Sequence, residues 1–121
     1  SCQSFGFRNG LPQDADLVFD VRCLPNPYYV PELKEHDGTE GPVRDYVMNA
    51  PESHEMLQKL EELLAFSIPL YQREGKSQLV VAVGCTGGRH RSVAIACQLA
   101  AYLRSLGYRV ELSHRDKDNR R

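Results

Sequence analysis

The chain has 121 residues, enough for one compact domain with a single hydrophobic core. Hydrophobic residues make up 41% of it and charged residues 26%, as in ordinary globular proteins, and no apolar run approaches the ~20 residues that span a bilayer. The net charge of −1 gives the chain as a whole no general affinity for nucleic acid, and the four cysteines lack the Cys-x-x-Cys spacing of zinc and thioredoxin-type motifs.

The N-terminal third is predicted to contain one strand and a long loop. Residues 16–24 are rich in β-forming side chains and favour a strand. Pro25 and Pro27 end this strand, because proline cannot donate a ladder hydrogen bond. The glycines and prolines between residues 31 and 42 indicate a long loop.

Two helices are predicted next. A short one covers residues 43–49, and a stronger one begins at Pro51, a residue that suits the first turn of a helix. Met56, Leu60 and Leu64 recur at helical spacing and give this helix an apolar face. Pro69 is expected to bend or end it, with residue 75 as the outer limit.

The last third predicts a strand at 79–84, a Gly-rich loop at 85–91, a helix at 92–106 and a strand at 108–113. This order predicts an α/β fold: a small, mostly parallel sheet flanked by helices, with the last two strands forming a parallel pair. Loop 85–91 and segment 22–26 both follow strands, so we expect them to meet at one edge of the sheet.

Cys23 and Cys97 lie in apolar segments, where free cysteine is typically buried, and this cysteine usage favours a reducing cytoplasm.

Loop 85–91 is the strongest candidate site, and it points to an anion. A Gly-rich turn before a helix directs several backbone N–H groups and the positive end of the helix dipole at one spot. Gly87 and Gly88 allow close approach, Thr86 and Ser92 offer hydroxyl groups, and Arg91 can bind a phosphate in bidentate fashion from the loop edge. The lysine-containing Walker pattern is absent.

The same segment allows two other interpretations. Cys85 and Arg91 fit the Cys-x5-Arg-Ser pattern of cysteine-dependent phosphatases, in which a thiolate attacks phosphorus and a residue such as Asp20 or Asp45 would be the general acid. These phosphatases usually carry a histidine where this chain has Gly84. In the third interpretation the glycines only form a turn, and His90 is a surface residue or a hydrogen-bonded core histidine.

A second group of candidates follows the first strand. Asp20 and Arg22 face the same side of a strand and are expected to form an ion pair, or to support the site. Asn26, in a rigid Pro-Asn-Pro turn, offers an amide that both donates and accepts. Of the two tyrosines, Tyr28 and Tyr29, we expect one in the core and one on the surface, where it could stack on a ligand.

Basic residues near the end of the chain are candidates for contacts with RNA phosphates, although a solvated tail explains them equally well. From residue 104 onward there are six cations and three acids. The candidates are Arg89, Arg104, Arg109, Arg115, Lys117, Arg120 and Arg121.

Several motifs together resemble the C-terminal domain of the RapZ/YvcJ family over essentially the whole chain. The motifs that carry the resemblance are Phe5-Gly-Phe7, Asp14-Ala-Asp16, Phe19-Asp-Val-Arg22, Leu24-Pro-Asn-Pro27 and Val83-Gly-Cys-Thr-Gly-Gly-Arg-His-Arg-Ser92. The resemblance implies that residues 1–121 are the single C-terminal domain of a longer protein. The N-terminal P-loop domain of that protein would bind ATP or GTP and hydrolyse it weakly.

The resemblance also implies a fold similar to part of phosphofructokinase, with an anion-binding loop between strand 79–84 and helix 92–106. Enterobacterial members bind small regulatory RNA, present it to an endoribonuclease, form oligomers and sense glucosamine-6-phosphate. Transferred to this chain, the sugar-phosphate site would use Asn26, Cys85, Thr86, Gly87, Gly88, His90, Arg91 and Ser92, with Asp20, Arg22 and Tyr28 nearby. This implies a non-enzymatic domain without a metal or cofactor of its own.

Two departures from the enterobacterial pattern affect these implications. Tyr28 stands where a histidine is expected after Leu-Pro-Asn-Pro, and acids dilute the basic tail at 114–121. Because RNA affinity depends on neutralising phosphates, the second departure weakens the expectation of RNA binding. Sensing of a sugar phosphate is therefore favoured over an RNA adaptor role.

Overall fold

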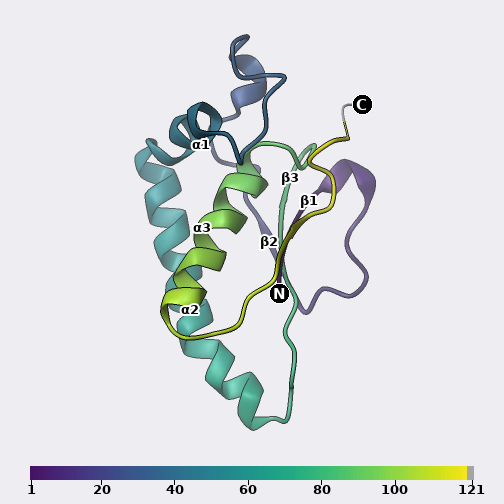
Figure 1. The fold of residues 1–121 in the computed structure, drawn as a ribbon, viewed down its shortest axis with the longest axis vertical. Helices are drawn as coiled ribbons and strands as arrows, with labels where there is room; N and C mark the ends of the chain where they lie inside the picture. Colours follow the sequence, from purple (N-terminus) through teal and green to yellow (C-terminus); the bar gives the residue numbers. More distant parts are fainter. Residues whose placement is uncertain (120–121) are drawn as a thin grey trace.

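The computed structural model, which describes residues 1–119, is an α/β fold and confirms the predicted class. Four parallel strands form one sheet in the order β2-β3-β1-β4, and the three α-helices lie together beside it (Figure 1). The strands are β1 (Cys2–Gly6), β2 (Leu17–Asp20), β3 (Val81–Cys85) and β4 (Leu112–His114). The helices are α1 (Gly41–Met48), α2 (Pro51–Arg73) and α3 (Arg91–Ser105), with short 3-10 helices η1 (Phe7–Asn9) and η2 (Pro27–Tyr29).

Strand β1, which we did not predict, lies in the interior of the sheet. It pairs with β3 from Cys2↔Val81 to Gly6↔Cys85, and with β4 from Cys2↔Leu112 to Ser4↔His114. The prediction that the last two strands pair directly was therefore wrong, since β1 lies between them. Its composition explains the omission, because Gln3 and Ser4 interrupt any apolar run, and Ser4 is fully buried where its hydroxyl contacts His114.

Helix α3 is the centre of the packing. It contacts β1 and β3 on one side and α1 and α2 on the other. Its first six residues, 91–96, are all buried, as are Leu99 and Leu103. Each fully buried leucine of this kind contributes about 1.5–3 kcal/mol through removal of apolar surface from water. The N-terminus of α3 is thereby fixed inside the molecule, next to the sheet.

Other boundaries differ from the predictions in ways that the contacts explain. Strand β2, predicted to run to residue 24, ends at Asp20, because the chain turns with a hydrogen bond from Leu24 N to Val21 O. Cys23, in this turn, is exposed rather than buried as expected, and Cys97 is partly buried.

Helix α2 continues through Pro69 to Arg73. The carbonyl that loses its N–H partner there belongs to Ala65, which is partly exposed and can bind water instead.

The carboxyl ends of β1, β2 and β3 meet at one edge of the sheet because the strands are parallel. Three segments leave from this edge: η1, the turn that leads to η2, and the β3–α3 loop at residues 86–90. None of the helices within residues 1–119 has both the length and the apolar character that crossing a bilayer demands.

Candidate functional site

A pocket of about 540 Å³ lies at this edge of the sheet, between the β3–α3 loop and η2. The predicted residues that line it are Asn26, Tyr28, Cys85, Thr86, Gly87, His90 and Arg91. The expected meeting of loop 85–91 with segment 22–26 is confirmed by two hydrogen bonds, from Arg91 Nη1 to Arg22 O and from Arg91 Nη1 to Leu24 O. Residues more than 60 positions apart in the sequence thus share one pocket.

Close packing requires a glycine at Gly88 of the β3–α3 loop, and Gly87 lies against a side chain that could move. Gly88 has a φ of +78°, and a Cβ there would lie 2.5 Å from Gly6 N. A Cβ on Gly87 would lie 2.6 Å from a guanidinium nitrogen of Arg8. The loop backbone is therefore pressed against the end of β1 on one side and against Arg8 on another.

Arg91 is the first residue of α3 and is only 5% exposed, so the expectation of an arginine at the loop edge was wrong. Its Nη1 donates to the carbonyl oxygens of Arg22, at 2.5 Å, and Leu24, at 3.2 Å, while its Nη2 lies 3.4 Å from Thr86 Oγ1. Its buried Nε has no hydrogen-bond partner within the described part of the chain. Nε and Nη2 form the edge of a guanidinium group that can hold two oxygens of one oxyanion.

Cys85 ends β3 and is buried, with its Sγ 3.1 Å from Ser92 Oγ on α3. The histidine that phosphatases carry before this cysteine has no room here, since a Cβ on Gly84 would lie 2.5 Å from Phe5 Cζ. Asp20 and Asp45, the suggested general acids, are both outside the pocket lining. The pocket thus brings a thiol and an arginine together but neither suggested acid.

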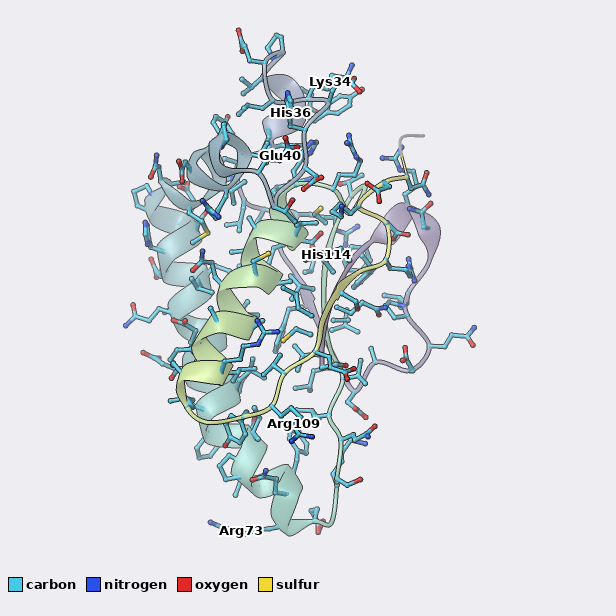
Figure 2. All side chains as sticks on the ribbon, viewed as in Figure 1. Lys34, His36, Glu40, Arg73, Arg109 and His114 are labelled. Atoms are coloured by element: carbon cyan, nitrogen blue, oxygen red, sulfur yellow. The ribbon has the colours of Figure 1, made fainter. Side chains whose placement is uncertain are left out.

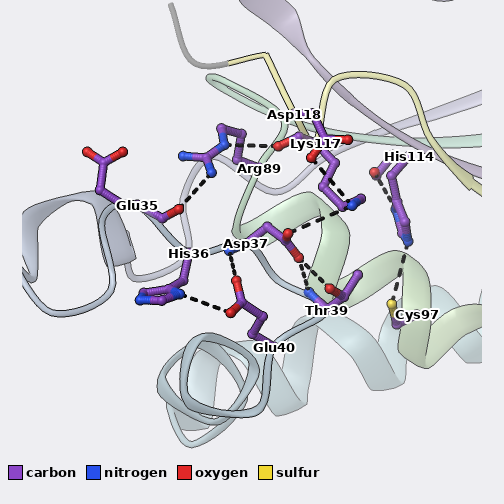
Figure 3. A network of polar contacts seen from close by, with 11 residues as sticks. Glu35, His36, Asp37, Thr39, Glu40, Arg89, Cys97, His114, Lys117 and Asp118 are labelled. Carbon is purple, nitrogen blue, oxygen red and sulfur yellow. Dashed lines mark hydrogen bonds and ion pairs between the residues drawn. The ribbon is translucent and has the colours of Figure 1, made fainter.

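His90 and Arg89 connect the loop to the segment that follows η2. Figure 3 shows the contact of Arg89 with Glu35. The His90 ring donates from Nε2 to Lys34 O at 3.1 Å, and burial lowers the pKa of this histidine below its usual value because it disfavours the charged form. Arg89 donates to three carbonyl oxygens, those of Lys34, Glu35 and Lys117. These two side chains therefore connect the segments that form the pocket wall and do not extend into solvent.

The η2 end of the pocket carries an amide side chain and two tyrosines. The Asn26 side chain accepts a hydrogen bond from Tyr28 N through Oδ1, at 3.1 Å. Its Nδ2 group can act as a hydrogen-bond donor to a ligand in the pocket. Tyr28 and Tyr29 are 50% and 79% exposed, so both are on the surface and the expectation of one in the core was wrong. The Lys34 ammonium lies 4.7 Å from the centre of the Tyr28 ring.

Asp20 and Arg22 form the expected ion pair, at 2.7 Å between Arg22 Nη2 and Asp20 Oδ2. The hydrogen bonds from Arg22 lower the pKa of Asp20 below its usual value. Arg22 also places its guanidinium 4.0 Å from the centre of the Phe7 ring. Neither Asp20 nor Arg22 lines the pocket, and Arg22 reaches the site through its backbone carbonyl. Gly88 and Ser92, which were also predicted for the site, do not line the pocket either. Ser92 contacts Cys85 through its hydroxyl group.

Four lining residues were not identified from the sequence: Arg8, Lys34, Glu35 and Asn119. They come from η1, the loop after η2 and the C-terminal segment, whereas Tyr29, which also lines the pocket, was one of the two tyrosines suggested for stacking on a ligand. No shared motif or spacing joins these positions, so only the three-dimensional arrangement could reveal them. Arg8 directly follows Phe5-Gly-Phe7, one of the motifs that carried the family resemblance.

The described basic residues suggested for RNA are spread along the molecule rather than gathered at one place. Arg109 lies near the lower end of the molecule in Figure 2, whereas Lys117 and Arg89 belong to the upper network of Figure 3. Arg104 donates to Val110 O, Arg115 to Asp116 and Gly10 O, and Lys117 pairs with Asp37 and Asp118. Arg120 and Arg121 lie outside the described residues. RNA binding stays a prediction.

Comparison with known proteins gives a consistent result. Residues 1–118 match the family model described as the RapZ C-terminal domain. A protein named nucleotide-binding protein in Alkaliphilus oremlandii is 59% identical over 118 residues, which cover 98% of this chain and 41% of that protein. Similarly named proteins are 57% identical over 113 residues in Clostridium acetobutylicum and 56% identical over 116 residues in Geobacter sulfurreducens. These matches cover 93% and 96% of this chain, and 38% and 41% of the relatives, so the chain spans about two fifths of each relative's length.

Proposed function

This chain belongs to the RapZ C-terminal domain family, and we propose that it is a regulatory module that binds an amino-sugar phosphate of the glucosamine-6-phosphate type. In this proposal the phosphate group lies against the β3–α3 loop and the N-terminus of α3. The sugar extends toward η2, where the Asn26 amide and the Tyr28 hydroxyl group can bind its hydroxyl groups. The domain itself carries out no reaction.

The observation that supports this proposal best is the buried Nε of Arg91, which has no hydrogen-bond partner among residues 1–119. A buried polar group without a hydrogen-bond partner costs about 1–3 kcal/mol, and more when it is charged. The carbonyl oxygens of Arg22 and Leu24 fix the other side of the guanidinium group, so its Nε–Nη2 edge cannot turn away easily. A bound oxyanion would accept from both nitrogens at once and relieve this cost.

The charge around the pocket favours the same kind of ligand. Arg8, Lys34, Arg89 and Arg91 line it together with one described acid, Glu35. Helix α3 adds the partial positive charge of its N-terminus, where the first N–H groups have no partner within the helix. These contributions act in a site that is partly shielded from water, where they are stronger than at an open surface.

Calorimetric titration with glucosamine-6-phosphate tests the proposal directly, with glucosamine as the ligand that lacks the phosphate. We expect the phosphorylated sugar to bind and to raise Tm, and glucosamine to do neither. The Arg91→Lys variant keeps the positive charge but loses the two-nitrogen edge, so it should bind at least about tenfold more weakly. If saturating concentrations leave Tm unchanged, the proposal is wrong.

The wider role implied by the family resemblance belongs to the same proposal. It includes binding of a small regulatory RNA, presentation of that RNA to an endoribonuclease, and assembly into homo-oligomers. The word nucleotide-binding in the names of the relatives supports a nucleotide site in the whole protein. We assign ATP or GTP to a P-loop domain in the part of the relatives that this chain does not span.

A cysteine-dependent phosphatase is the second candidate, favoured by the 3.1 Å contact between Cys85 Sγ and Ser92 Oγ beside Arg91. The pocket lining lacks both suggested general acids, which argues for binding rather than turnover. Release of inorganic phosphate from the sugar phosphate, abolished by Cys85→Ser, would instead identify an enzyme.

A further inference from the structure

We infer that a groove at the opposite end of the sheet, where the strands begin, is the docking site for the chain segment that precedes residue 1 in the longer proteins of this family. This inference goes beyond the proposed function, because it concerns neither the pocket of the β3–α3 loop nor its ligand. The match covers 41% of the relative from Alkaliphilus oremlandii, and the family model describes a C-terminal domain. We therefore place the additional chain of these relatives before the domain.

The groove has a volume of about 440 Å³ and lies between the C-terminal half of α2, the segment that follows α3 and the residues that lead into β3. Its apolar lining includes Ile68, Leu79, Leu103, Tyr108 and Val110. Leu103 belongs to the buried core, and the other four side chains are partly buried and pack against that core. The groove is thus a part of the hydrophobic core that opens to the surface.

Ser1 lies in this groove and already continues β1 backward by one residue. Its terminal nitrogen donates to Leu79 O at 2.6 Å, and its carbonyl oxygen accepts from Val81 N at 2.8 Å. On the other side, Cys2 N donates to Glu111 O at 2.8 Å. A residue joined to Ser1 must therefore start between the chain that leads into β3 and the chain that leads into β4 (Figure 1).

The register of the sheet also places the side chain of that preceding residue. Cys2 pairs with Val81 on one side and with Leu112 on the other, and its side chain is fully buried in the core below the helices. Successive side chains of a strand point to opposite faces. If β1 continues in the same register, the residue directly before Ser1 faces the same side of the sheet as Cys2.

Two apolar side chains border this position. Leu79 and Val110 each lie two residues before the partner of Cys2 in their own segment, and both are partly buried against the core. An apolar side chain between them would remove its own surface and theirs from water, whereas a charged side chain would lose hydration there. We therefore expect an apolar residue directly before Ser1. One position earlier the side chain faces the other side of the sheet, so a polar residue fits there.

Three-residue tails added before Ser1 of the 121-residue chain test whether the groove accepts such a side chain. In the tail Ser-Ser-Val the valine adjoins Ser1 and faces the groove, and in the tail Ser-Val-Ser the same residues place the valine on the opposite side. We expect the first tail to give a Tm about 3–6 °C higher than the second. Equal Tm values for the two tails would overturn the inference.

Two valine substitutions show whether the difference between the tails comes from the groove. Each is made in both tailed chains, so that its own effect on stability cancels in the comparison. Val110→Ser should remove most of the difference in Tm, because Val110 borders the proposed position. Val18→Ser, on the edge strand β2, is the matched control and should leave the difference within about 2 °C of its original value. Equal effects of the two substitutions would contradict the assignment to the groove.

The full-length protein that carries this domain tests the occupant. Replacing the residue directly before Ser1 by Asp should lower the Tm of the domain by about 3–6 °C, and Asp one position earlier, as the control, should change it by less than about 2 °C. Equal effects at the two positions, or no effect at either, would assign the groove to another occupant and overturn the inference. Neither result depends on binding of a sugar phosphate, so the proposed function can fail while this inference stands.

Discussion

The carboxylate of Asp116 accepts a hydrogen bond of 2.7 Å from the backbone N–H of Gly6, and so joins the C-terminal segment to the end of the central strand β1. Asp116 is only 7% exposed and also pairs with Arg115, at 2.9 Å. Its Cβ lies where a side chain on Gly88 would have to go, at 2.9 Å. Asp116 therefore holds the end of β1 and packs closely against the pocket loop at Gly88.

Replacing Asp116 by Asn should lower the free energy of unfolding by about 1–3 kcal/mol, because an amide is a weaker acceptor for both partners. Burial opposes ionisation of Asp116, but hydrogen bonds from Arg115 and Gly6 N outweigh it and lower the pKa. A lowered pKa means that this stabilisation is present above the ordinary value of 3.8 and is lost as the pH falls through the folded-state value. Urea unfolding at pH 7 measures the loss, and Asp118→Asn, at an exposed neighbour, should cost less than about 0.5 kcal/mol.

Arg91→Ala should weaken the fold as well as anion binding, contrary to what a loop-edge position would imply. The substitution leaves the carbonyl oxygens of Arg22 and Leu24 without their donor and opens a cavity at the start of α3. We expect a loss of about 2–4 kcal/mol in the free energy of unfolding. Arg22→Ala removes an exposed guanidinium and should cost about 1 kcal/mol or less. Equal Tm values for Arg91→Ala and wild type would contradict the structural role.

Gly88→Ala separates backbone strain from packing when it is compared with Gly107→Ala. Both glycines have a positive φ, +78° and +96°, but of the two only the Cβ at Gly88 would meet atoms of residues 1–119 within 4 Å. The left-handed conformation alone should cost about 1–2 kcal/mol at Gly107. Gly88→Ala should cost clearly more and should also abolish phosphate binding, because the loop must move away from Gly6. Chemical denaturation of the two variants gives the comparison.

Stability should fall as the pH drops below about 6.5, through His90 and His114. Burial lowers the pKa of both, since it disfavours the imidazolium form. A histidine with a lowered folded-state pKa stabilises the protein above its unfolded-state pKa of 6.5, and this contribution is lost as the pH falls through the folded-state value. Unfolding measured between pH 7.5 and 5 should show this loss. His114→Gln should make the slope shallower, and His54→Gln, on the exposed side of α2, is the control.

The sequence predicted the parts of the fold whose signals are local. A run of apolar residues before a Gly-rich turn placed β3, the loop and α3 within two residues, and the spacing of Leu60 and Leu64 placed α2. Strand β1 gave no such signal, because its stability comes from two neighbours formed by residues 81–85 and 112–114. Its polar Ser4 is buried, and its hydroxyl group lies 2.7 Å from Nδ1 of His114 on β4.

For the candidate site, too, the sequence predicted the residues with local signals and missed the features that depend on long-range contacts. Residues contributed by one continuous loop could be named from their order along the chain, as could Asn26 in its rigid turn. The burial of Arg91 could not, because it depends on carbonyl groups of a turn almost 70 residues earlier. Arg8 and Lys34 are ordinary surface cations by sequence, and only the parallel arrangement of β1, β2 and β3 brings their segments to the same edge.

The central place of β1 has a consequence for synthesis on the ribosome. Cys2–Gly6 is made before the rest of the domain, yet it acquires its first hydrogen-bonded neighbour only when residues 81–85 have been made and its second only with residues 112–114. At about 5–20 residues per second, the nascent strand waits for several seconds with both edges unpaired. A chaperone that binds extended segments would find its target there, and the waiting ends only when the final strand closes the sheet.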